Sequence, residues 1–396
     1  MPLTPASVDL GMTSNSSSIY YCPAKLHAVI NGSFDREVFG SMWTTFYVDA
    51  NGYATGNRPF PFPPENQPFI AESKAFYNIV GANPSLTVIA RSNDSQFHEA
   101  GVYISATNEV YFTSNILNTT TSGDNNEYRY PIYANFNKIS LNHTNGTYDW
   151  GVVLMAIQGY QLSVPSSIIS FDPLTRKTET LLNNFYGRPF NSLNDVAVLT
   201  RGREIETPVG EQWVFFTDPA YGYYLQKFKQ YPRLPSQVYA FHPPTGTIRV
   251  VADGLQKPNG IQFSPDMRTC YISDTGLLSE DPADSAPRDG SGPGTIYAYD
   301  VVHPEPGSDP TTDPPALVNK RLFAFTDNAS PDGIKVDTEG NVYAGCFDGV
   351  HVWNRNGALL GKILLGLDVP SDVPGVPAGR DRLYLAKIKA KGALLP

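Results

Sequence analysis

Four acid or amide residues stand at equivalent places in the sequence, each at the start of a similar segment. They are Glu99, Asn194, Asn259 and Asp332. Two carboxylates and two amide oxygens are hard ligands, which suit a divalent cation such as Ca²⁺. A single Asn-Gly or Asp-Gly pair would indicate only a turn. Four equivalent positions favour a different interpretation, in which the fold brings the four side chains together around one metal ion.

The elements that must position these residues are strands. Each residue precedes an alternating apolar run, a turn, and a second strand that contains Tyr or Phe, as antiparallel hairpins do. These segments are 99–115, 194–218, 259–274 and 332–346, and further strand pairs follow at 236–252, 294–327 and 349–365. Four strands per unit, recurring roughly every 50–75 residues, predict a β-propeller. A β-sandwich of similar length is the alternative fold.

Two more units complete a six-bladed ring of four-stranded antiparallel blades. A fifth unit fits residues 145–182. A sixth is assembled by pairing the C-terminal run 381–391 with the early strand 85–92. Pairing the two ends of the chain would close the ring and remove exposed sheet edges.

The first 84 residues do not follow the repeat. We expect residues 1–84 to be an N-terminal extension packed on a propeller of residues 85–396. The extension contains a Pro-rich loop at 59–68 and a helix predicted over 71–80, which Gly81 would end.

Composition agrees with an all-β fold. The chain holds 33 Gly and 34 Pro among 396 residues, and only 17% of its residues are charged. These values exclude a helical bundle, a coiled coil and a mostly disordered chain. The net charge of −9 argues against a nucleic-acid partner. Residues 151–171 are uncharged and long enough to cross a membrane. Gln, Pro and Ser interrupt them, so we expect two buried strands and no membrane partner.

Seven N-x-S/T sequons exceed the number expected by chance and favour a secreted glycoprotein. The acceptors are Asn15, Asn31, Asn93, Asn118, Asn142, Asn145 and Asn328. Residues 1–22 lack the basic and apolar regions of a signal peptide, which keeps an intracellular protein as the alternative. Cys22, Cys270 and Cys346 allow at most one disulfide.

Seven segments, in the same order along most of residues 85–355, carry a family resemblance. They are FHEAGVY (97–103), LLNNFYGRPFNSLNDVAV (181–198), FFTDPAYGYY (215–224), LPSQVYAF (234–241), KPNGIQFSPD (257–266), YISDTG (271–276) and SPDGIKVDTEGNVYAGCFDGVHVWN (330–354). The sequence resembles the senescence-marker-protein-30/gluconolactonase family of six-bladed propeller lactonases, in particular the fungal lactonohydrolases that open aldonolactones and pantoyl lactone.

The resemblance implies a metal held by Glu99, Asn259 and Asp332, with Asn194 at or beside it. Ca²⁺ is the expected ion, and Zn²⁺, Mn²⁺ and Mg²⁺ are alternatives. Zinc comes second because paired His or Cys ligands are missing. One position departs from the animal members, which place an Arg two residues before the Asn. Ser192 stands there instead, which weakens the expectation of a sugar lactone.

The expected chemistry is metal-assisted hydrolysis of a small-molecule lactone, a carboxylic ester hydrolase reaction. Asp332 is the implied candidate for activating water, and His98 is the second candidate. Alternation along an extended strand would turn His98 away from its neighbour, which favours a supporting role. Asp218, Tyr221 and Tyr223 follow an inner hairpin and, with Asn194, are candidate substrate contacts.

Other catalytic motifs are missing from the sequence. There is no G-x-S-x-G elbow and no phosphate-binding G-x-x-x-x-G-K-S/T, and Val102 breaks the H-E-x-x-H pattern that begins at His98. Two alternative functions stay open. One is other chemistry on the same metal platform, such as organophosphate hydrolysis or a biosynthetic cyclisation. The other is a propeller that binds a partner without catalysis. Monomer and dimer are both compatible with the sequence.

Overall fold

The structure of the chain is a computed structural model. It describes residues 18–21, 39–40, 47–48, 67–92, 97–104, 109–114, 117–118, 132–133, 136–140, 153–172, 175–200, 212–277, 292–326, 330–346, 349–365 and 381–393. In this part of the chain strands dominate, and the two helices are short: α1 (Phe76–Val80) and α2 (Tyr221–Tyr224). The predicted all-β class is confirmed. Cys22 and the seven predicted glycosylation sites fall outside the side chains that are described.

Two sheets are four-stranded and antiparallel, and their strands follow one another in chain order. The first contains β16 (Val196–Leu199), β17 (Trp213–Asp218), β18 (Gln237–His242) and β19 (Thr247–Ala252). The second contains β20 (Pro258–Phe263), β21 (Thr269–Asp274), β22 (Thr295–Val302) and β23 (Ala316–Phe325). Both match the hairpins and strand pairs expected from the sequence.

A third four-stranded unit is extended by strands from the N-terminal segment. It contains β24 (Ile334–Val336), β25 (Val342–Cys346), β26 (Gly349–Trp353) and β27 (Leu359–Leu364). β4 (Phe69–Ala71) pairs antiparallel with β27, and β1 (Ile19–Tyr21) pairs parallel with β4. Residues 19–21 and 69–71 of the segment 1–84 are therefore joined to this sheet. The domain boundary at residue 84 stays a prediction.

The remaining sheets are smaller. Three-stranded sheets are formed by β6 (Glu99–Ile104), β7 (Glu109–Thr113) and β10 (Phe136–Ser140), and by β11 (Val153–Ile157), β12 (Ser167–Phe171) and β13 (Thr178–Leu182). Short pairs are β2 (Phe39–Gly40) with β3 (Tyr47–Val48), β8 (Leu117–Asn118) with β9 (Ile132–Tyr133), and β14 (Asn184–Phe185) with β15 (Arg188–Pro189).

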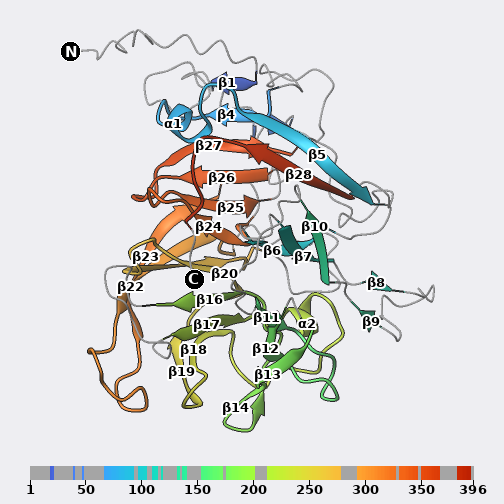
Figure 1. Cartoon of the computed structure of the whole chain (residues 1–396), viewed down its shortest axis with the longest axis vertical. Coiled ribbons are helices and arrows are strands. Elements are labelled where there is room, and N and C mark those ends of the chain that lie inside the picture. The colour runs from blue at the N-terminus through green and yellow to red at the C-terminus, as the bar shows by residue number, and fades with distance from the viewer. Residues whose placement is uncertain are drawn as a thin grey trace.

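The predicted pairing of the two ends of the repeat region is confirmed. β5 (Ser85–Ser92) and β28 (Asp381–Lys387) lie antiparallel over their whole length, with Ser85 opposite Lys387. Figure 1 shows this blue and red pair beside the sheet of β24–β27. The count of six blades stays a prediction, since some of the expected blades are described here as two or three strands.

Successive sheets pack face to face, and alternation along single strands explains why. In β17, Phe215 packs towards Ile261 and Phe263 of the next sheet, whereas Val214 and Phe216 pack towards the sheet of β11–β13. Side chains along a strand point alternately to its two faces, so a strand buried on both faces is apolar throughout. The sheets of β24–β27, β20–β23 and β16–β19 therefore follow one another, as they do down Figure 1, in a propeller-like arrangement.

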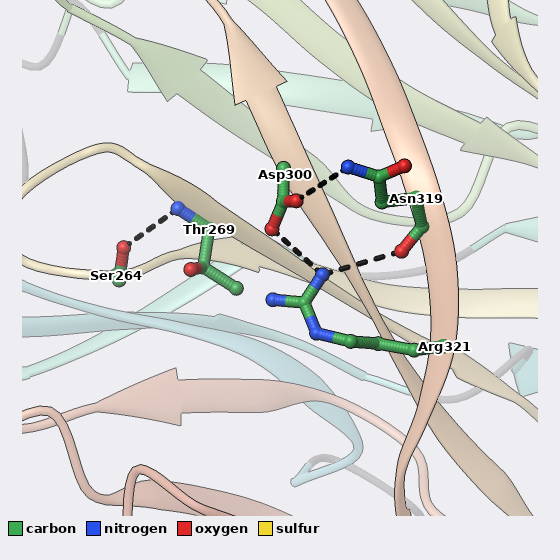
Figure 2. A network of polar contacts seen from close by, with 5 residues as sticks. All are labelled: Ser264, Thr269, Asp300, Asn319 and Arg321. Atoms are coloured by element: carbon green, nitrogen blue, oxygen red, sulfur yellow. Dashed lines mark hydrogen bonds and ion pairs between the residues drawn. The ribbon is translucent and has the colours of Figure 1, made fainter.

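Figure 2 shows polar contacts within the sheet of β20–β23. The Ser264 hydroxyl accepts a hydrogen bond from the Thr269 N–H at 2.9 Å, which closes the hairpin of β20 and β21. Arg321 of β23 forms a 2.7 Å ion pair with Asp300 of β22, and Asn319 donates to the same carboxylate at 2.8 Å. The contacts around Asp300 are exposed, so they set register more than they stabilise the fold.

Two local predictions are resolved by the structure. The described part of the uncharged stretch, 153–171, forms β11 and β12, an antiparallel hairpin, as expected, although most residues of the two strands are half-buried and not buried. The helix predicted over 71–80 is wrong in extent, because α1 covers only Phe76–Val80. Ala71 ends β4 instead, where it is opposite Gly361. Because Ala71 pairs with the edge of β27, the predicted stretch begins as a strand and not as a helix. No helix in the described ranges is long and apolar enough to cross a membrane.

Candidate metal centre

The starts of the innermost strands meet because a glycine lets two of them approach closely. Gly260 of β20 lies against the main chain of residues 332–334, just before and within β24. A methyl carbon at Gly260 would lie 2.8 Å from the Ile334 nitrogen and even closer to the Asp332 oxygen. Only a residue without a side chain fits there. The Gly of the Asn259-Gly260 pair is therefore required by packing, and it brings Asn259 beside Asp332.

Asn259 and Asp332 contact each other directly. The side chain of Asn259 hydrogen-bonds to the Asp332 carboxylate. A carboxylate accepts, so the Asn259 Nδ2 group is the donor and its Oδ1 atom points elsewhere. That Oδ1 atom has no hydrogen-bond partner, although Asn259 is only 6% exposed. A buried acceptor without a donor is costly in a folded protein and calls for a ligand.

Glu99, the first residue of β6, lies close enough to Asp332 for the charges of the two carboxylates to interact. Burial raises the pKa of its carboxyl group to about 7, and His98 lowers it, while the charges of Asp332 and Asp195 raise it further. The side chain nevertheless keeps 35% of its surface accessible. Glu99 is thus surrounded by protein and still open to solvent. The carboxylates of Glu99 and Asp332 repel each other, and a bound cation would relieve that repulsion.

Asp332 has the same electrostatic surroundings. Burial raises the pKa of this carboxyl group and the charge of Asp195 raises it further, whereas His98 and the hydrogen bonds from Asn259 and the Gly333 N–H lower it. Its side chain is exposed to solvent. Two acids that meet at a solvent-accessible point, next to an unsatisfied amide oxygen, have the composition of a Ca²⁺ site.

His98 lies on the same side as these acids. Its Nε2 atom is 3.9 Å from the Glu99 Oε1 atom, and 33% of its side chain is accessible. The expectation that alternation would turn His98 away from Glu99 is wrong. His98 precedes β6, which begins at Glu99, and the register of β6 is interrupted by a bulge between Glu99 and Val102. Regular alternation does not hold at such a place.

Asn194 occupies the position in its sheet that Asp332 occupies in its own. The Asn194 N–H donates to the Thr217 main-chain oxygen at 3.0 Å, and the Asp332 N–H donates to the Gly345 main-chain oxygen at 2.8 Å. The side chain of Asn194 is half-buried. Its role as a ligand or substrate contact stays a prediction.

Asp195 is a third acid at this centre that sequence reasoning did not single out. Its charge raises the pKa of both Glu99 and Asp332. Its Oδ2 atom accepts from the Ile261 N–H at 3.0 Å, which ties the sheet of β16 to β20. The sequence could have indicated Asp195, because this residue directly follows Asn194 at the start of a repeated segment.

Asp218 is not placed to contact a substrate. Its side chain has no exposed surface, and its carboxylate accepts from the N–H groups of Asn191 at 3.0 Å and Ser192 at 2.9 Å. Burial raises the pKa of this carboxyl group to about 7, and these hydrogen bonds and Lys229 lower it. Asp218 holds the segment that leads to Asn194. Asp274 likewise accepts from the Lys257 N–H at 2.8 Å.

The two tyrosines of α2 lie in different surroundings. Tyr221 is buried and shares a hydrogen bond with the Thr275 hydroxyl. Burial raises the pKa of its phenol, and the charges of Asp332 and Glu99 raise it further. Tyr223 is half-buried, and its ring packs edge-on against Tyr224 and Tyr231. Of the two, the structure brings Tyr221 to the acids.

Ser192, which replaces the Arg of animal relatives, is fully buried. Its hydroxyl accepts a hydrogen bond from the Gly222 N–H of α2 at 2.8 Å. A methyl carbon at Gly222 would lie 2.6 Å from that hydroxyl. The position therefore anchors α2, which carries Tyr221, and has no room for an Arg.

The residues at this centre fit a hard divalent cation. Across the described ranges, no group of three or more His, Cys, Asp and Glu side chains is arranged for a metal. The predicted set has two such residues, Glu99 and Asp332, and relies on amide oxygens for the rest. The unpartnered Asn259 Oδ1 atom beside Asp332 supplies one of them.

Comparisons with known proteins agree with this architecture. A family model described as the SMP-30/gluconolactonase/LRE-like region matches residues 145–389. The lactonohydrolase oryL of Aspergillus oryzae is 30% identical over 393 residues, which cover 92% of this chain and 82% of that protein. A gluconolactonase of Zymomonas mobilis is 27% identical over 199 residues, or 50% of this chain and 48% of that protein.

A solved structure extends the likeness to the fold. The gluconolactonase of Xanthomonas campestris superposes with a TM-score of 0.51 at 19% identity, over 82% of this chain and 95% of that chain. The propeller-like arrangement of the sheets is therefore shared with a solved gluconolactonase. The resemblance recognised in the sequence is confirmed, and the chain belongs to the SMP-30/gluconolactonase/LRE-like family.

Proposed function

We propose that this protein is a metal-dependent lactonase that hydrolyses a small-molecule lactone of the aldonolactone or pantoyl-lactone type. The observation that carries the proposal is the buried, unpartnered Asn259 Oδ1 atom beside two mutually repelling acids, Glu99 and Asp332. Relatives named lactonohydrolase and gluconolactonase support the choice of substrate class.

Glu99, Asn259 and Asp332 would hold the cation, with Asn194 at or beside it. Ca²⁺ suits this oxygen set, and Mn²⁺, Mg²⁺ and Zn²⁺ are the alternatives. When bound, the cation polarises the lactone carbonyl and stabilises the oxyanion that forms as water adds. The ring C–O bond would then break, the alkoxide would take up the proton that the base removed from the attacking water, and the hydroxy acid would ionise to its carboxylate and release one proton.

His98 and Asp332 are the two candidates for accepting the proton of the attacking water. Both keep solvent-exposed surface, and the His98 ring lies 3.9 Å from Glu99 at the edge of the acid group. Asp332 would be a ligand at the same time, which lowers its basicity, so we assign the proton to His98 first. Tyr221, whose phenol stays protonated, is proposed to contact the substrate, and Tyr223 to line the approach.

The test is proton release from a panel of γ- and δ-lactones, followed by pH-stat titration. The panel includes aldonolactones and pantoyl lactone. Glu99→Gln and removal of metal by EDTA should each lower kcat/KM at least about 100-fold. Glu179→Gln is the matched control, because it removes the charge of an exposed acid on β13. His98→Gln should lower kcat while leaving Ca²⁺ affinity unchanged.

Two outcomes would refute the proposal. Full activity in protein shown by elemental analysis to be free of metal would exclude metal dependence. Proton release from none of the lactones would exclude a lactonase. In that second case, hydrolysis of paraoxon would favour the organophosphate alternative on the same platform, and inertness towards both would favour a binding propeller.

A further inference from the structure

A hydroxyl residue followed by Asp ends the second strand of two successive sheets. These pairs are Thr217-Asp218 in β17 and Ser273-Asp274 in β21. We propose that the hydroxyls of Thr217 and Ser273 are positioning residues, which set the main chain of Asn259 and Asp332 and so the geometry of the metal centre. This inference rests on the proposed function, since it concerns the same centre.

Each hydroxyl reaches forward into the next sheet. The Thr217 hydroxyl donates to the Asn259 main-chain oxygen at 2.7 Å. The Ser273 hydroxyl donates to the Asp332 main-chain oxygen at 2.8 Å. In both cases the acceptor is the carbonyl of a proposed ligand residue. Thr217 and Ser273 have no exposed surface, so water cannot replace these bonds.

Each hydroxyl also accepts a main-chain hydrogen bond, which fixes its orientation. The Thr217 hydroxyl accepts from the Asp195 N–H at 3.0 Å, and the Ser273 hydroxyl accepts from the Gly260 N–H at 2.7 Å. A hydroxyl has one proton, so an accepted bond on one side directs that proton to the carbonyl on the other. The ligand strands of neighbouring sheets are thereby linked through single side-chain atoms.

The Asp of each pair accepts hydrogen bonds from main-chain N–H groups that precede the first strand of its own sheet. Asp274 accepts from the N–H groups of Gln256 at 3.0 Å and Lys257 at 2.8 Å, three and two residues before Asn259. Asp218 does the same three and two residues before Asn194, through Asn191 and Ser192. The main chain of Asn259 is therefore held from both sides, by Asp274 before it and by Thr217 at its own carbonyl.

The sheet of β24–β27 lacks such a hydroxyl. In β25 the equivalent residue is Gly345, whose oxygen accepts from the Asp332 N–H. The sheet that packs next to β24–β27 is that of β5 and β28, which contribute Leu86 and the adjoining Ile388 to the shared cluster. Neither strand contains Glu99, Asn194, Asn259 or Asp332.

The test measures Ca²⁺ affinity by isothermal titration calorimetry on the full-length chain, alongside thermal unfolding. Thr217→Val and Ser273→Ala should each weaken Ca²⁺ binding roughly 10–100-fold, the range typical of partners that orient metal ligands. Thr217→Ser keeps the hydroxyl and should bind within about threefold of the wild type. Thr326→Val is the matched control, because it removes a buried hydroxyl that donates to the Gly294 oxygen at 3.1 Å, away from the ligand strands.

The outcomes separate this inference from the proposed function. A wild type that binds none of Ca²⁺, Mn²⁺, Mg²⁺ and Zn²⁺ would overturn both. A wild type that binds, with Thr217→Val and Ser273→Ala binding equally well and losing only as much thermal stability as Thr326→Val, would overturn the positioning role alone. If Thr217→Val does not fold, Ser273→Ala decides the question, since it removes a single oxygen atom.

Discussion

Gly260→Ala is the sharpest perturbation that the structure offers, because it inserts one carbon between two ligand strands. That carbon would lie 2.8 Å from the Ile334 main-chain nitrogen and even closer to the Asp332 main-chain oxygen. Ordinary van der Waals contact begins at 3.4 Å. Main-chain atoms cannot rotate away, so β20 and β24 must separate by at least about 0.6 Å, the difference between these two distances. The displacement falls directly between Asn259 and Asp332.

Both stability and activity should respond to that displacement. Overpacking of this kind costs about 1–3 kcal/mol of unfolding free energy. A misplacement of about 1 Å in a catalytic group can cost about 100-fold in rate. Roughly 0.6 Å then corresponds to a loss of about tenfold or more in kcat/KM, which equals about 1.4 kcal/mol of transition-state stabilisation. Urea denaturation and pH-stat kinetics on the best lactone measure the two effects.

Gly333→Ala is the matched control for this experiment. Gly333 follows Asp332 as Gly260 follows Asn259, but a methyl carbon there would meet no atom within 4 Å. The variant keeps the Gly333 N–H that bonds to Asp332, so stability and activity should stay close to those of the wild type. Equal effects of the two substitutions, or full activity in Gly260→Ala, would refute the argument from close strand approach.

Three further predictions follow from the same contacts. The pKa of Asp218 is raised to about 7 in the fold, so its charged form disfavours the native state and the stability it contributes falls as pH rises from about 4 to about 7; Asp218→Asn should remove that slope, on the order of 2.5 kcal/mol between pH 5 and pH 7.5, in urea titrations at those two values. Ser192→Arg should destabilise the fold by at least about 3 kcal/mol, because the buried hydroxyl bonded to Gly222 has no space around it; an unchanged urea midpoint would contradict this. Ca²⁺ at 100 times its Kd should stabilise the wild type by about 2.7 kcal/mol, a rise of a few degrees in Tm, and Asn259→Leu should abolish that rise; a Ca²⁺-induced shift that persists in the variant would count against Asn259 as a ligand.

Strand pairing was the part of the fold that local patterns could predict. The alternation around Phe215, and turn residues such as those between β20 and β21, act over a few residues and are visible in the sequence. The pairing of β5 with β28 could be predicted as well, because an unpaired end of a repeat needs a partner. The helix over 71–80 was overextended, since its first residues are taken by the edge of β27.

The candidate site was predictable only in its repeated positions. Asn259 and Asp332 recur at equivalent places, and the structure brings them into contact. Asp195, Thr217 and Ser273 act across neighbouring sheets, through bonds such as that from Ile261 to Asp195, and no spacing in the sequence encodes such a contact.

The pairing of β5 with β28 has a consequence for synthesis of the protein. About 290 residues separate the facing residues Ser92 and Asp381. At about 5–20 residues per second, a ribosome needs about 15–60 s between making the first strand and the second. In the described part of the chain, β28 is the sheet neighbour of β5, so until then β5 presents a bare edge to other nascent chains. We therefore expect the yield in a heterologous host to depend on chaperones that protect this edge.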